Sequence, residues 1–261
     1  MRSIYNDFVS PEEKGEIGED IIYRDLDRIE GRKAFLPNCY IPKHNGGTTE
    51  IDLIFLHESG VYVIESKNYS GWIFGDEERE YWTQCLQSVG GVAEKNQFYN
   101  PLWQNEIHIY ALMELLQDDT FPYYSYIVFG DNCELKNIRL TSGNHHVTYY
   151  EYLLQDISGN AQQMGRCLSN EKMDELYSLL VKFTDASDEQ KARHIEEVRA
   201  KHYPIIQPDG TWTCPQCGGR LVPRVARRGS GAGKTFWGCS NYPKCHFIYN
   251  CLLYTSDAAD D

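Results

Sequence analysis

The sequence predicts a mixed α/β domain followed by a small metal-bound module. An amphipathic helix, three apolar extended segments, a second helix and a further extended segment follow one another in the first half of the chain. Four cysteines with metal-ligand spacing stand near its C-terminal end. With 261 residues, the chain is long enough for one sizeable core and a small second module.

The first helix is expected to begin at Ser10. Ser10 is a capping residue, Pro11 suits the first helical position, and Glu13 completes a capping box. An apolar stripe at the helical period then predicts the buried face: Ile17, Ile21, Ile22, Leu26 and Ile29. Glu16 and Glu19 lie on a different face of this helix.

Three extended segments follow at residues 34–41, 50–56 and 61–67. The short turn between the last two predicts a hairpin. Their cores are almost entirely apolar, which favours a central sheet covered on both faces. Residues 76–97 show no regular period and are left as irregular. A second helix follows Asn100-Pro101, and strands are expected at 124–129 and 146–150.

Beyond residue 150 the pattern becomes helical, and residues 185–201 are charge-rich. His145 and His146 are interpreted as a pair in a loop, and Trp72 and Trp82 as packing residues. The expected domains are 1–150 for the α/β domain, 151–210 for a helical extension and charged linker, 211–250 for the cysteine module, and 251–261 for a tail. That tail (CLLYTSDAAD from Cys251) resembles a translated sequencing adapter and is treated as non-native.

Charge and hydropathy exclude some classes of protein. The net charge of −13 argues against a protein that coats DNA indiscriminately. No signal-peptide-like stretch begins the chain and no apolar run is long enough to span a membrane, so a soluble, cytoplasmic protein with no membrane partner is expected. Residues 211–250 contain six Lys and Arg and no Asp or Glu, so the cysteine module is basic.

A candidate catalytic site lies on the second and third extended segments. Glu65 and Lys67 are two residues apart on one strand, so their side chains point to one face, and a short turn brings Asp52 alongside. Two carboxylates that repel each other suit a divalent cation such as Mg²⁺. A lysine beside them can orient a water or lower its pKa. A Glu-x-Lys pair on a strand is, however, most often a surface ion pair.

The order of these motifs resembles the nuclease-related domain (NERD) family of the PD-(D/E)xK nuclease superfamily. The resemblance covers about residues 11–130 and rests on GEIGE at residues 15–19, EIDL at 50–53, VIESKNYSG at 63–71, and Asn100-Pro101 with Gln104. It implies a restriction-endonuclease-like mixed sheet flanked by helices. It also implies metal ligands at Asp52 and Glu65, and Lys67 as the catalytic lysine.

The same resemblance implies that Glu19 supplies an additional acidic ligand, with Glu16 as the competing choice. Gln104 and His108 lie one helical turn apart and are able to reach the same cleft, or they form a solvated polar face. The implied activity is that of a Mg²⁺- or Mn²⁺-dependent endonuclease-like phosphodiesterase acting on DNA or RNA. The alternative is a non-catalytic module that keeps a nuclease fold to bind nucleic acid or a protein.

The cysteine spacing predicts a zinc ribbon. Cys214 and Cys217 form one pair, and Cys239 and Cys245 form the other. Zn²⁺ accepts four thiolates tetrahedrally, and a closed four-sulfur shell has no open position for substrate, so the predicted role of the ion is structural. Disulfide bonds are the alternative.

The module resembles the C-terminal four-cysteine ribbons of bacterial type I topoisomerases. The matching residues are CPQCGG from Cys214, Arg224, FWGCS from Phe236, and NYPKC from Asn241. This implies binding to DNA, with single-stranded regions as the preferred form, through cations and stacking aromatics. The expected binding residues are Arg224, Arg227, Arg228, Lys234, Phe236, Trp237 and Tyr242. Alternatively, the aromatics form the ribbon's small core, or the ribbon binds a protein such as a polymerase subunit.

Overall fold

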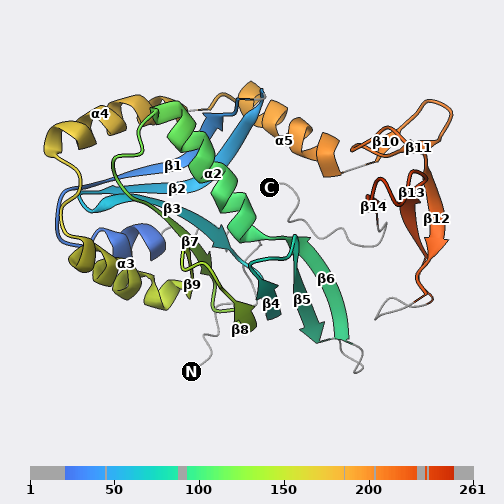
Figure 1. Cartoon of the computed structure of the whole chain (residues 1–261), viewed down its shortest axis with the longest axis horizontal. Coiled ribbons are helices and arrows are strands. Elements are labelled where there is room, and N and C mark those ends of the chain that lie inside the picture. Colours follow the sequence, from blue (N-terminus) through green and yellow to red (C-terminus); the bar gives the residue numbers. More distant parts are fainter. Residues whose placement is uncertain are drawn as a thin grey trace. The chain divides into compact units, whose positions relative to one another are not determined.

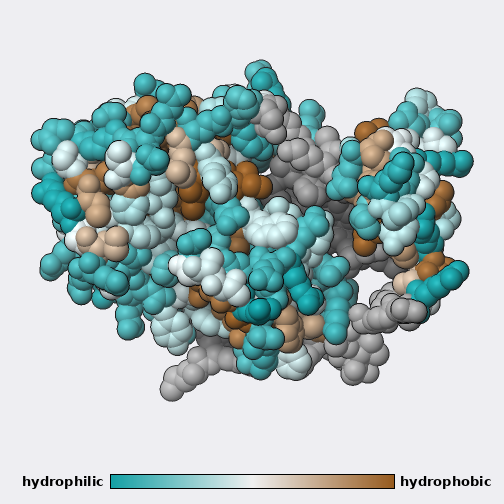
Figure 2. Space-filling model, in the orientation of Figure 1, coloured by the Kyte–Doolittle hydropathy of each residue, from teal (hydrophilic) through white to brown (hydrophobic). Residues whose placement is uncertain are grey.

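The structure is a computed structural model that describes residues 21–44, 46–87, 93–184, 186–202, 204–227, 233 and 235–249 (Figure 1). The chain divides into two compact units, residues 1–186 and residues 187–261. Within the described ranges, every helix is too short or too polar to span a bilayer. Figure 2 shows one face of the molecule, where hydrophilic side chains cover most of the described surface.

A five-stranded sheet forms the centre of the first unit, in the order β1-β2-β3-β7-β9 (Figure 1). Its strands are β1 (Lys33–Pro42), β2 (Thr48–His57), β3 (Gly60–Lys67), β7 (Tyr123–Phe129) and β9 (His145–Tyr149). The first three run antiparallel, and β7 and β9 continue the sheet in parallel. His57 pairs with Gly60, so the predicted hairpin is confirmed.

Helices cover both faces of this sheet, as the apolar strand cores predicted. On one face lie α2 (Pro101–Leu116), α4 (Asn170–Leu180) and η2 (Val181–Phe183), whose apolar side chains pack on Ile54, Val61 and Val63. The opposite face packs against α3 (Tyr150–Met164) and residues 21–29, the C-terminal part of the predicted first helix and the turn after it. Within that segment Ile22, Leu26 and Ile29 are buried, as predicted, whereas Ile21 of the predicted stripe is only partly buried.

A second, four-stranded sheet has the order β6-β5-β4-β8. Its strands are β4 (Gly71–Asp76), β5 (Tyr81–Gln87), β6 (Ala93–Tyr99) and β8 (Cys133–Arg139). Strand β5 and most of β6 lie in the segment 76–97 that was expected to be irregular, so that expectation was wrong. Trp82 packs in its core at 1% exposure, and a Cβ at Gly75 would lie 2.4 Å from the Trp82 ring. Trp72, expected to pack, is 37% exposed with the Lys136 ammonium over its ring.

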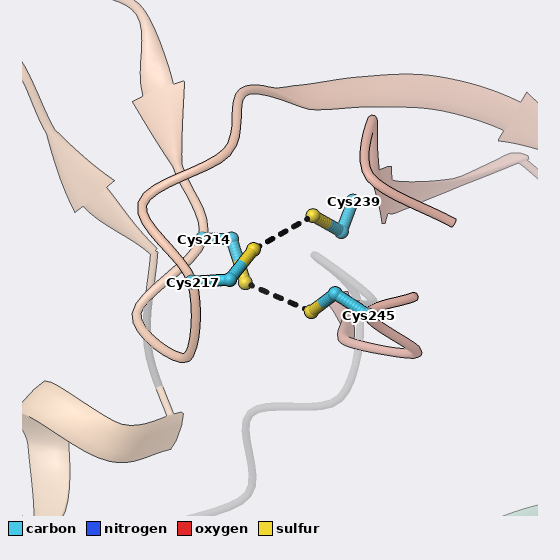
Figure 3. Close-up of side chains that lie close together, drawn as sticks. All are labelled: Cys214, Cys217, Cys239 and Cys245. Atoms are coloured by element: carbon cyan, nitrogen blue, oxygen red, sulfur yellow. Dashed lines mark hydrogen bonds between the residues drawn. The ribbon is translucent and has the colours of Figure 1, made fainter. Parts of the chain in front are cut away.

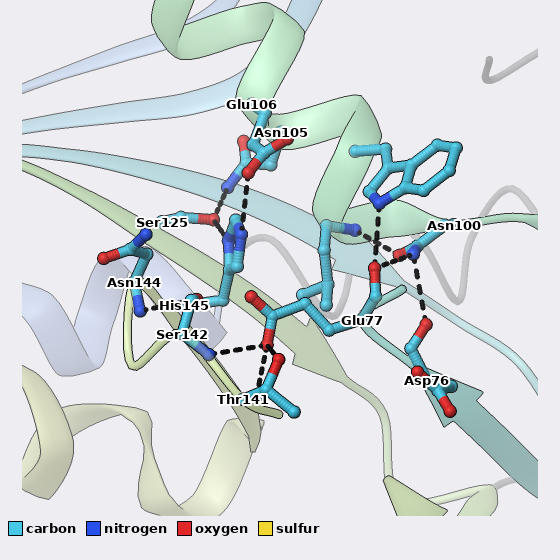
Figure 4. Close-up of polar contacts among 12 residues, drawn as sticks. Asp76, Glu77, Asn100, Asn105, Glu106, Ser125, Thr141, Ser142, Asn144 and His145 are labelled. Carbon is cyan, nitrogen blue, oxygen red and sulfur yellow. Dashed lines mark hydrogen bonds and ion pairs between the residues drawn. The ribbon is translucent and has the colours of Figure 1, made fainter. Parts of the chain in front are cut away.

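Polar side chains anchor α2 at its N-terminus (Figure 4). Asn100 accepts a hydrogen bond from the backbone N–H of Leu102 as the predicted cap, and its amide group donates to backbone carbonyls of residues 76, 77 and 79. The Glu77 carboxylate accepts hydrogen bonds from Thr141 and Ser142. The Asn100 contacts hold the start of α2 against the turn between β4 and β5, and the Glu77 contacts join that turn to the connection between β8 and β9.

The second unit contains the charge-rich helix α5 (Asp188–His202) and five short strands. The strands are β10 (Ile205–Ile206), β11 (Trp212–Thr213), β12 (Leu221–Val225), β13 (Thr235–Cys239) and β14 (Ile248–Tyr249). Strands β10 and β11 pair, and β12, β13 and β14 form a three-stranded antiparallel sheet. Its small core consists of three of the four clustered cysteines with Leu221 and Phe247.

Candidate functional site

Glu65 and Lys67 lie at the C-terminal end of β3, where they form a buried ion pair. The Lys67 Nζ is 2.9 Å from the Glu65 Oε1, and the side chains are 10% and 1% exposed, respectively. Both residues point to one face because they are two apart on a strand. The predicted Glu-x-Lys pair is therefore not a solvated surface pair.

Asp52 lies on the neighbouring strand, at the point where β2 stops pairing with β3. The β2–β3 ladder ends with Leu53 opposite Ile64. Beyond it, the Asp52 Oδ2 accepts a hydrogen bond of 2.8 Å from the backbone N–H of Ser66. The carboxylate thus takes the place of a strand partner, directly beside the residue that separates Glu65 from Lys67. The two strands bring the three predicted residues into one region.

His108 completes the surroundings of Glu65 from helix α2. Its Nε2 lies 3.3 Å from the Glu65 Oε2, and its Nδ1 lies 2.9 Å from the Thr49 Oγ1. His108 and Thr49 are 3% and 6% exposed. His108 is therefore buried against Glu65 and is not part of a solvated polar face. Gln104, one turn earlier, is half-buried, and no side-chain hydrogen bond of Gln104 exists within the described part of the chain.

The two carboxyl groups have opposite pKa shifts. Burial raises the pKa of Asp52 well above its ordinary value, and the negative charge of Glu65 adds to this, while Lys67 and the Ser66 N–H oppose it. Burial acts in the same direction on Glu65, but the Lys67 ammonium and His108 outweigh it and lower the pKa of Glu65 to about 2. Such divergent acids side by side are common at functional sites.

The donor set of this region fits a divalent cation. The Glu65 Oε2 is buried and has no hydrogen-bond partner, and a metal ion is a suitable partner for such an oxygen. Mg²⁺ is usually held by only one or two carboxylates plus waters. Among the described residues, Asp52, Glu65 and His108 do not form a three-ligand group with all atoms within 4.8 Å of one another. Glu19 and Glu16, the other predicted acidic residues, lie outside the described residues.

A second polar network, which was not predicted from the sequence, crosses from α2 to the sheet edge (Figure 4). Asn105 donates to the Val63 carbonyl and to the Ser125 Oγ. His145 links Ser125, at 2.9 Å, with Glu106, at 3.2 Å. His145 lies in strand β9, so its expected place in a loop was wrong. One signal was available, because Asn105 is three residues before His108 and therefore shares its helix face.

The four cysteines form the predicted metal cluster (Figure 3). The sulfurs of Cys214 and Cys245 are 3.6 Å apart, those of Cys217 and Cys239 are 3.3 Å apart, and all four lie within 4.8 Å of one another. Four sulfurs at about 2.3 Å from a tetrahedral Zn²⁺ would be separated by about 3.8 Å. All four are free thiols, so the disulfide alternative is excluded in this structure.

Neighbouring groups favour the thiolate at Cys217, whereas burial raises the pKa of Cys214 to about 12 and also raises the pKa of Cys239. The Gly219 N–H, followed by the contact from Cys239, lowers the pKa of Cys217 to about 6, which favours the thiolate form that zinc requires. Asn241 donates its backbone N–H to the Cys239 sulfur and its side-chain amide to the Cys217 sulfur, each at 3.4 Å. A Cβ at Gly219 would lie 2.7 Å from the Asn241 amide nitrogen, so glycine is needed there.

The predicted nucleic-acid-binding residues of the ribbon divide between the two faces of its sheet. Trp237 packs with Trp212, at a ring separation of 4.8 Å, on the face that carries the small core. On the other face, the Arg224 guanidinium lies 5.6 Å from the centre of the Tyr242 ring, which is 58% exposed. Phe236 shares this second face with Arg224, its partner across the ladder.

Arg224 also has a structural contact, because its Nη2 donates to the Cys239 carbonyl at 3.0 Å. Arg227 is exposed, two residues beyond the end of β12. Arg228 and Lys234 lie outside the described residues. Trp237 therefore packs against the ribbon's core, as one of the two alternatives expected, whereas Tyr242 is exposed to solvent.

A known protein family matches a segment of each unit. Residues 14–130 match the family model described as nuclease-related domain, and residues 212–252 match the one described as topoisomerase DNA binding C4 zinc finger. An uncharacterized protein of Bacillus anthracis is 32% identical over 192 residues, which span 73% of this chain and 86% of that protein.

A DNA topoisomerase 1 of Archaeoglobus fulgidus is 36% identical over 83 residues, 32% of this chain and 11% of that much longer enzyme. No solved structure matches the chain. The matched family models indicate a nuclease-related, nucleic-acid-binding function for the first unit and DNA binding with a structural zinc ion for the second. The chain belongs to the nuclease-related domain family and joins that domain to a topoisomerase-type zinc ribbon.

Proposed function

We propose that this protein is a metal-dependent nuclease that hydrolyses phosphodiester bonds in DNA, and that its zinc ribbon holds the DNA strand. The observation that carries the proposal is the buried ion pair of Glu65 with Lys67, whose carboxylate keeps one oxygen without a hydrogen-bond partner. Asp52 is anchored to the backbone between them. A purely structural ion pair would not need an unsatisfied oxygen or a second carboxyl beside it.

Each residue has a distinct role in this proposal. Asp52 and Glu65 hold Mg²⁺ or Mn²⁺, and Glu19 adds a further carboxylate. When bound, the ion stabilises negative charge on the phosphodiester and lowers the pKa of water. Lys67 orients the attacking water, because Glu65 holds its ammonium group at a defined position.

The ribbon compensates for the acidity of the chain. A protein with a net charge of −13 is poorly suited to hold DNA over its whole surface. Arg224, Phe236 and Tyr242 combine a cation with aromatic rings on one face, an arrangement that binds single-stranded nucleic acid without strong sequence preference. Tethering the two units raises the local concentration of DNA near Glu65 and Lys67.

Cleavage of circular DNA tests the catalytic half of the proposal. Single- and double-stranded circles are incubated with the protein in Mg²⁺, in Mn²⁺ and with neither ion. Glu65→Gln and Lys67→Gln are expected to lower the metal-dependent rate by about 100-fold or more. Glu134→Gln and Lys136→Gln, which alter an exposed Glu-x-Lys pair on β8, serve as matched controls and should cleave like the wild type.

A non-catalytic binding module is the second candidate, and the burial of Glu65 at 1% exposure favours it, because substrate needs access to the metal site. This candidate predicts salt-dependent DNA binding without metal-dependent cleavage by any variant. Equal cleavage by wild type and Glu65→Gln would place the activity elsewhere.

Binding of a single-stranded oligonucleotide tests the ribbon. Tyr242→Ala should weaken affinity by about 5- to 150-fold, the range expected for loss of one stacked base. Tyr177→Ala, which removes an exposed tyrosine of helix α4, is the control and should bind normally. Removal of zinc with a chelator should abolish the ribbon's contribution, because its small core depends on the four cysteines. Unchanged DNA binding after zinc removal would instead favour a protein partner for the ribbon.

A further inference from the structure

Two buried ligand atoms lie side by side between helix α2 and strand β3, and neither has a hydrogen-bond partner. These atoms are the Glu65 Oε2 and the His108 Nε2. They are 3.3 Å apart, which is the distance of an ion pair, but neither atom has an aligned hydrogen bond. Buried polar atoms are nearly always paired, so two adjacent exceptions call for a third group that binds both.

The other polar atoms of these side chains are occupied. The Glu65 Oε1 contacts the Lys67 ammonium at 2.9 Å, and the His108 Nδ1 contacts the Thr49 hydroxyl at 2.9 Å. Each side chain is therefore held at one end, with its remaining ligand atom directed to the same place. A metal-binding histidine typically has its second ring nitrogen bonded to an oxygen, which is the position that Thr49 occupies.

Helix α2 is fixed in the register that places His108 over β3. Asn105, one turn earlier on the same face, donates to the Val63 carbonyl and to the Ser125 hydroxyl at 3.0 and 2.9 Å. The N-terminus of the helix is capped by Asn100. These contacts prevent the helix from rotating or sliding along its axis. The position of His108 beside Glu65 is therefore set by the fold of the domain.

We propose that the His108 Nε2 and the Glu65 Oε2 are both direct ligands of the divalent ion, and that the imidazole makes the site prefer Mn²⁺ to Mg²⁺. This inference rests on the proposed function. Two neighbouring ligands at about 2.1 Å from an octahedral ion are about 3 Å apart, close to the observed separation. Imidazole suits transition metals, whereas Mg²⁺ takes oxygen ligands and retains its waters.

Pulsed electron paramagnetic resonance of bound Mn²⁺ tests this directly on the untagged, zinc-loaded full chain. Histidine nitrogen coordinated to Mn²⁺ produces ¹⁴N modulation, which becomes ¹⁵N modulation in protein labelled with ¹⁵N-histidine. The wild type is expected to show this change. The four-cysteine cluster contains no histidine and therefore does not contribute to it.

Variants then assign the signal and the metal preference. His108→Gln should lose the nitrogen modulation and bind Mn²⁺ at least about 10-fold more weakly, with a smaller loss for Mg²⁺. His44→Gln removes a histidine whose side chain is 89% exposed and should retain both properties. If His108→Gln fails to fold, the wild type alone still overturns the inference when isotope exchange shows no histidine nitrogen on the ion.

The outcomes separate this inference from the proposed function. Mn²⁺ that binds in a Glu65-dependent manner without nitrogen modulation would overturn the role of His108 and leave the nuclease proposal intact. Nitrogen modulation that persists in His108→Gln would also overturn it. Mn²⁺ binding that is absent, or unaffected by Glu65→Gln, would overturn both.

Discussion

The chain contains the same short motif twice on described strands, with opposite surroundings. Glu65-Ser66-Lys67 on β3 is buried, with side chains 1% and 10% exposed at its acid and base. Glu134-Leu135-Lys136 on β8 is a solvated pair, with side chains 57% and 35% exposed. Both are Glu-x-Lys on a strand, and both form ion pairs. The motif by itself therefore carries no information about catalysis, and the difference lies in the neighbours of each pair.

Those neighbours come from distant parts of the chain. Helix α2 brings His108, and strand β2 brings Thr49 and Asp52, to the pair on β3. In contrast, Lys136 lies over the exposed ring of Trp72, in contact with solvent. A charge in low-dielectric surroundings interacts strongly with its few partners, whereas a charge in water is screened. Three stability measurements follow from this contrast.

Removal of the lysine should have the largest effect. Lys67→Met leaves the buried Glu65 carboxylate without its main counter-charge, and we expect a loss of about 3–5 kcal/mol in the free energy of unfolding. Lys136→Met should change it by about 0–1 kcal/mol, because that pair is exposed. Urea unfolding at a fixed zinc concentration measures both. Similar losses for the two variants would show that burial does not make the pair on β3 stronger than the exposed pair on β8.

The second largest effect should be a difference between Glu65 and Glu134 in how stability changes as the pH is lowered. Because the pKa of Glu65 is lowered to about 2 from an ordinary value of 4.5, its contribution is fully present above the ordinary value and is lost as pH falls toward 2. A shift of this size corresponds to about 3 kcal/mol at most. Glu65→Gln should therefore lose less stability than the wild type between about pH 5 and about pH 3. Glu134→Gln should lose stability with falling pH as the wild type does. If Glu65→Gln also loses as much stability as the wild type, the pKa of Glu65 is not lowered in the folded state.

Replacement of Asp52 should have the smallest effect on the free energy of unfolding, and it should raise this energy instead of lowering it. Its pKa is raised, so the folded state loses stability as pH increases from the ordinary range of an aspartate toward the folded value. Asp52→Asn keeps an acceptor for the Ser66 N–H and removes the charge, and we expect the metal-free protein to gain stability at neutral pH. Asp131→Asn, at an exposed position, is the control. A loss of stability in Asp52→Asn would mean that the carboxylate is well accommodated without metal.

Prediction of the fold from sequence was good where side-chain periodicity was strong. The three apolar strands and the hairpin between β2 and β3 were predicted near their observed bounds. Helix α2 was found from its Asn-Pro start, which the cap at Asn100 confirms. Local signals sufficed here because a strand buried on both faces has a continuous apolar run, and a helix start has a recognisable capping residue.

The second sheet was missed because its strands have little periodicity of their own. Strand β6 includes the run Glu94-Lys95-Asn96-Gln97, which is polar throughout. Strand β4 gains its parallel partner β8 from a segment about sixty residues away, beginning with Gly71 opposite Cys133. Pairing between distant segments stabilises these elements, and sequence neighbours do not report it.

By itself, the sequence determined the chemistry that was available: four thiols at ligand spacing, and two carboxyl groups with an amine on adjoining strands. It also determined the apolar patterns that fold the central sheet. Only the tertiary structure decided which Glu-x-Lys pair is buried and that His108 and Thr49 complete its surroundings. It likewise separated Trp237 from Tyr242 on the ribbon. Burial and ion-pair strength depend on contacts between residues far apart in the chain, whereas ligand identity belongs to each residue alone.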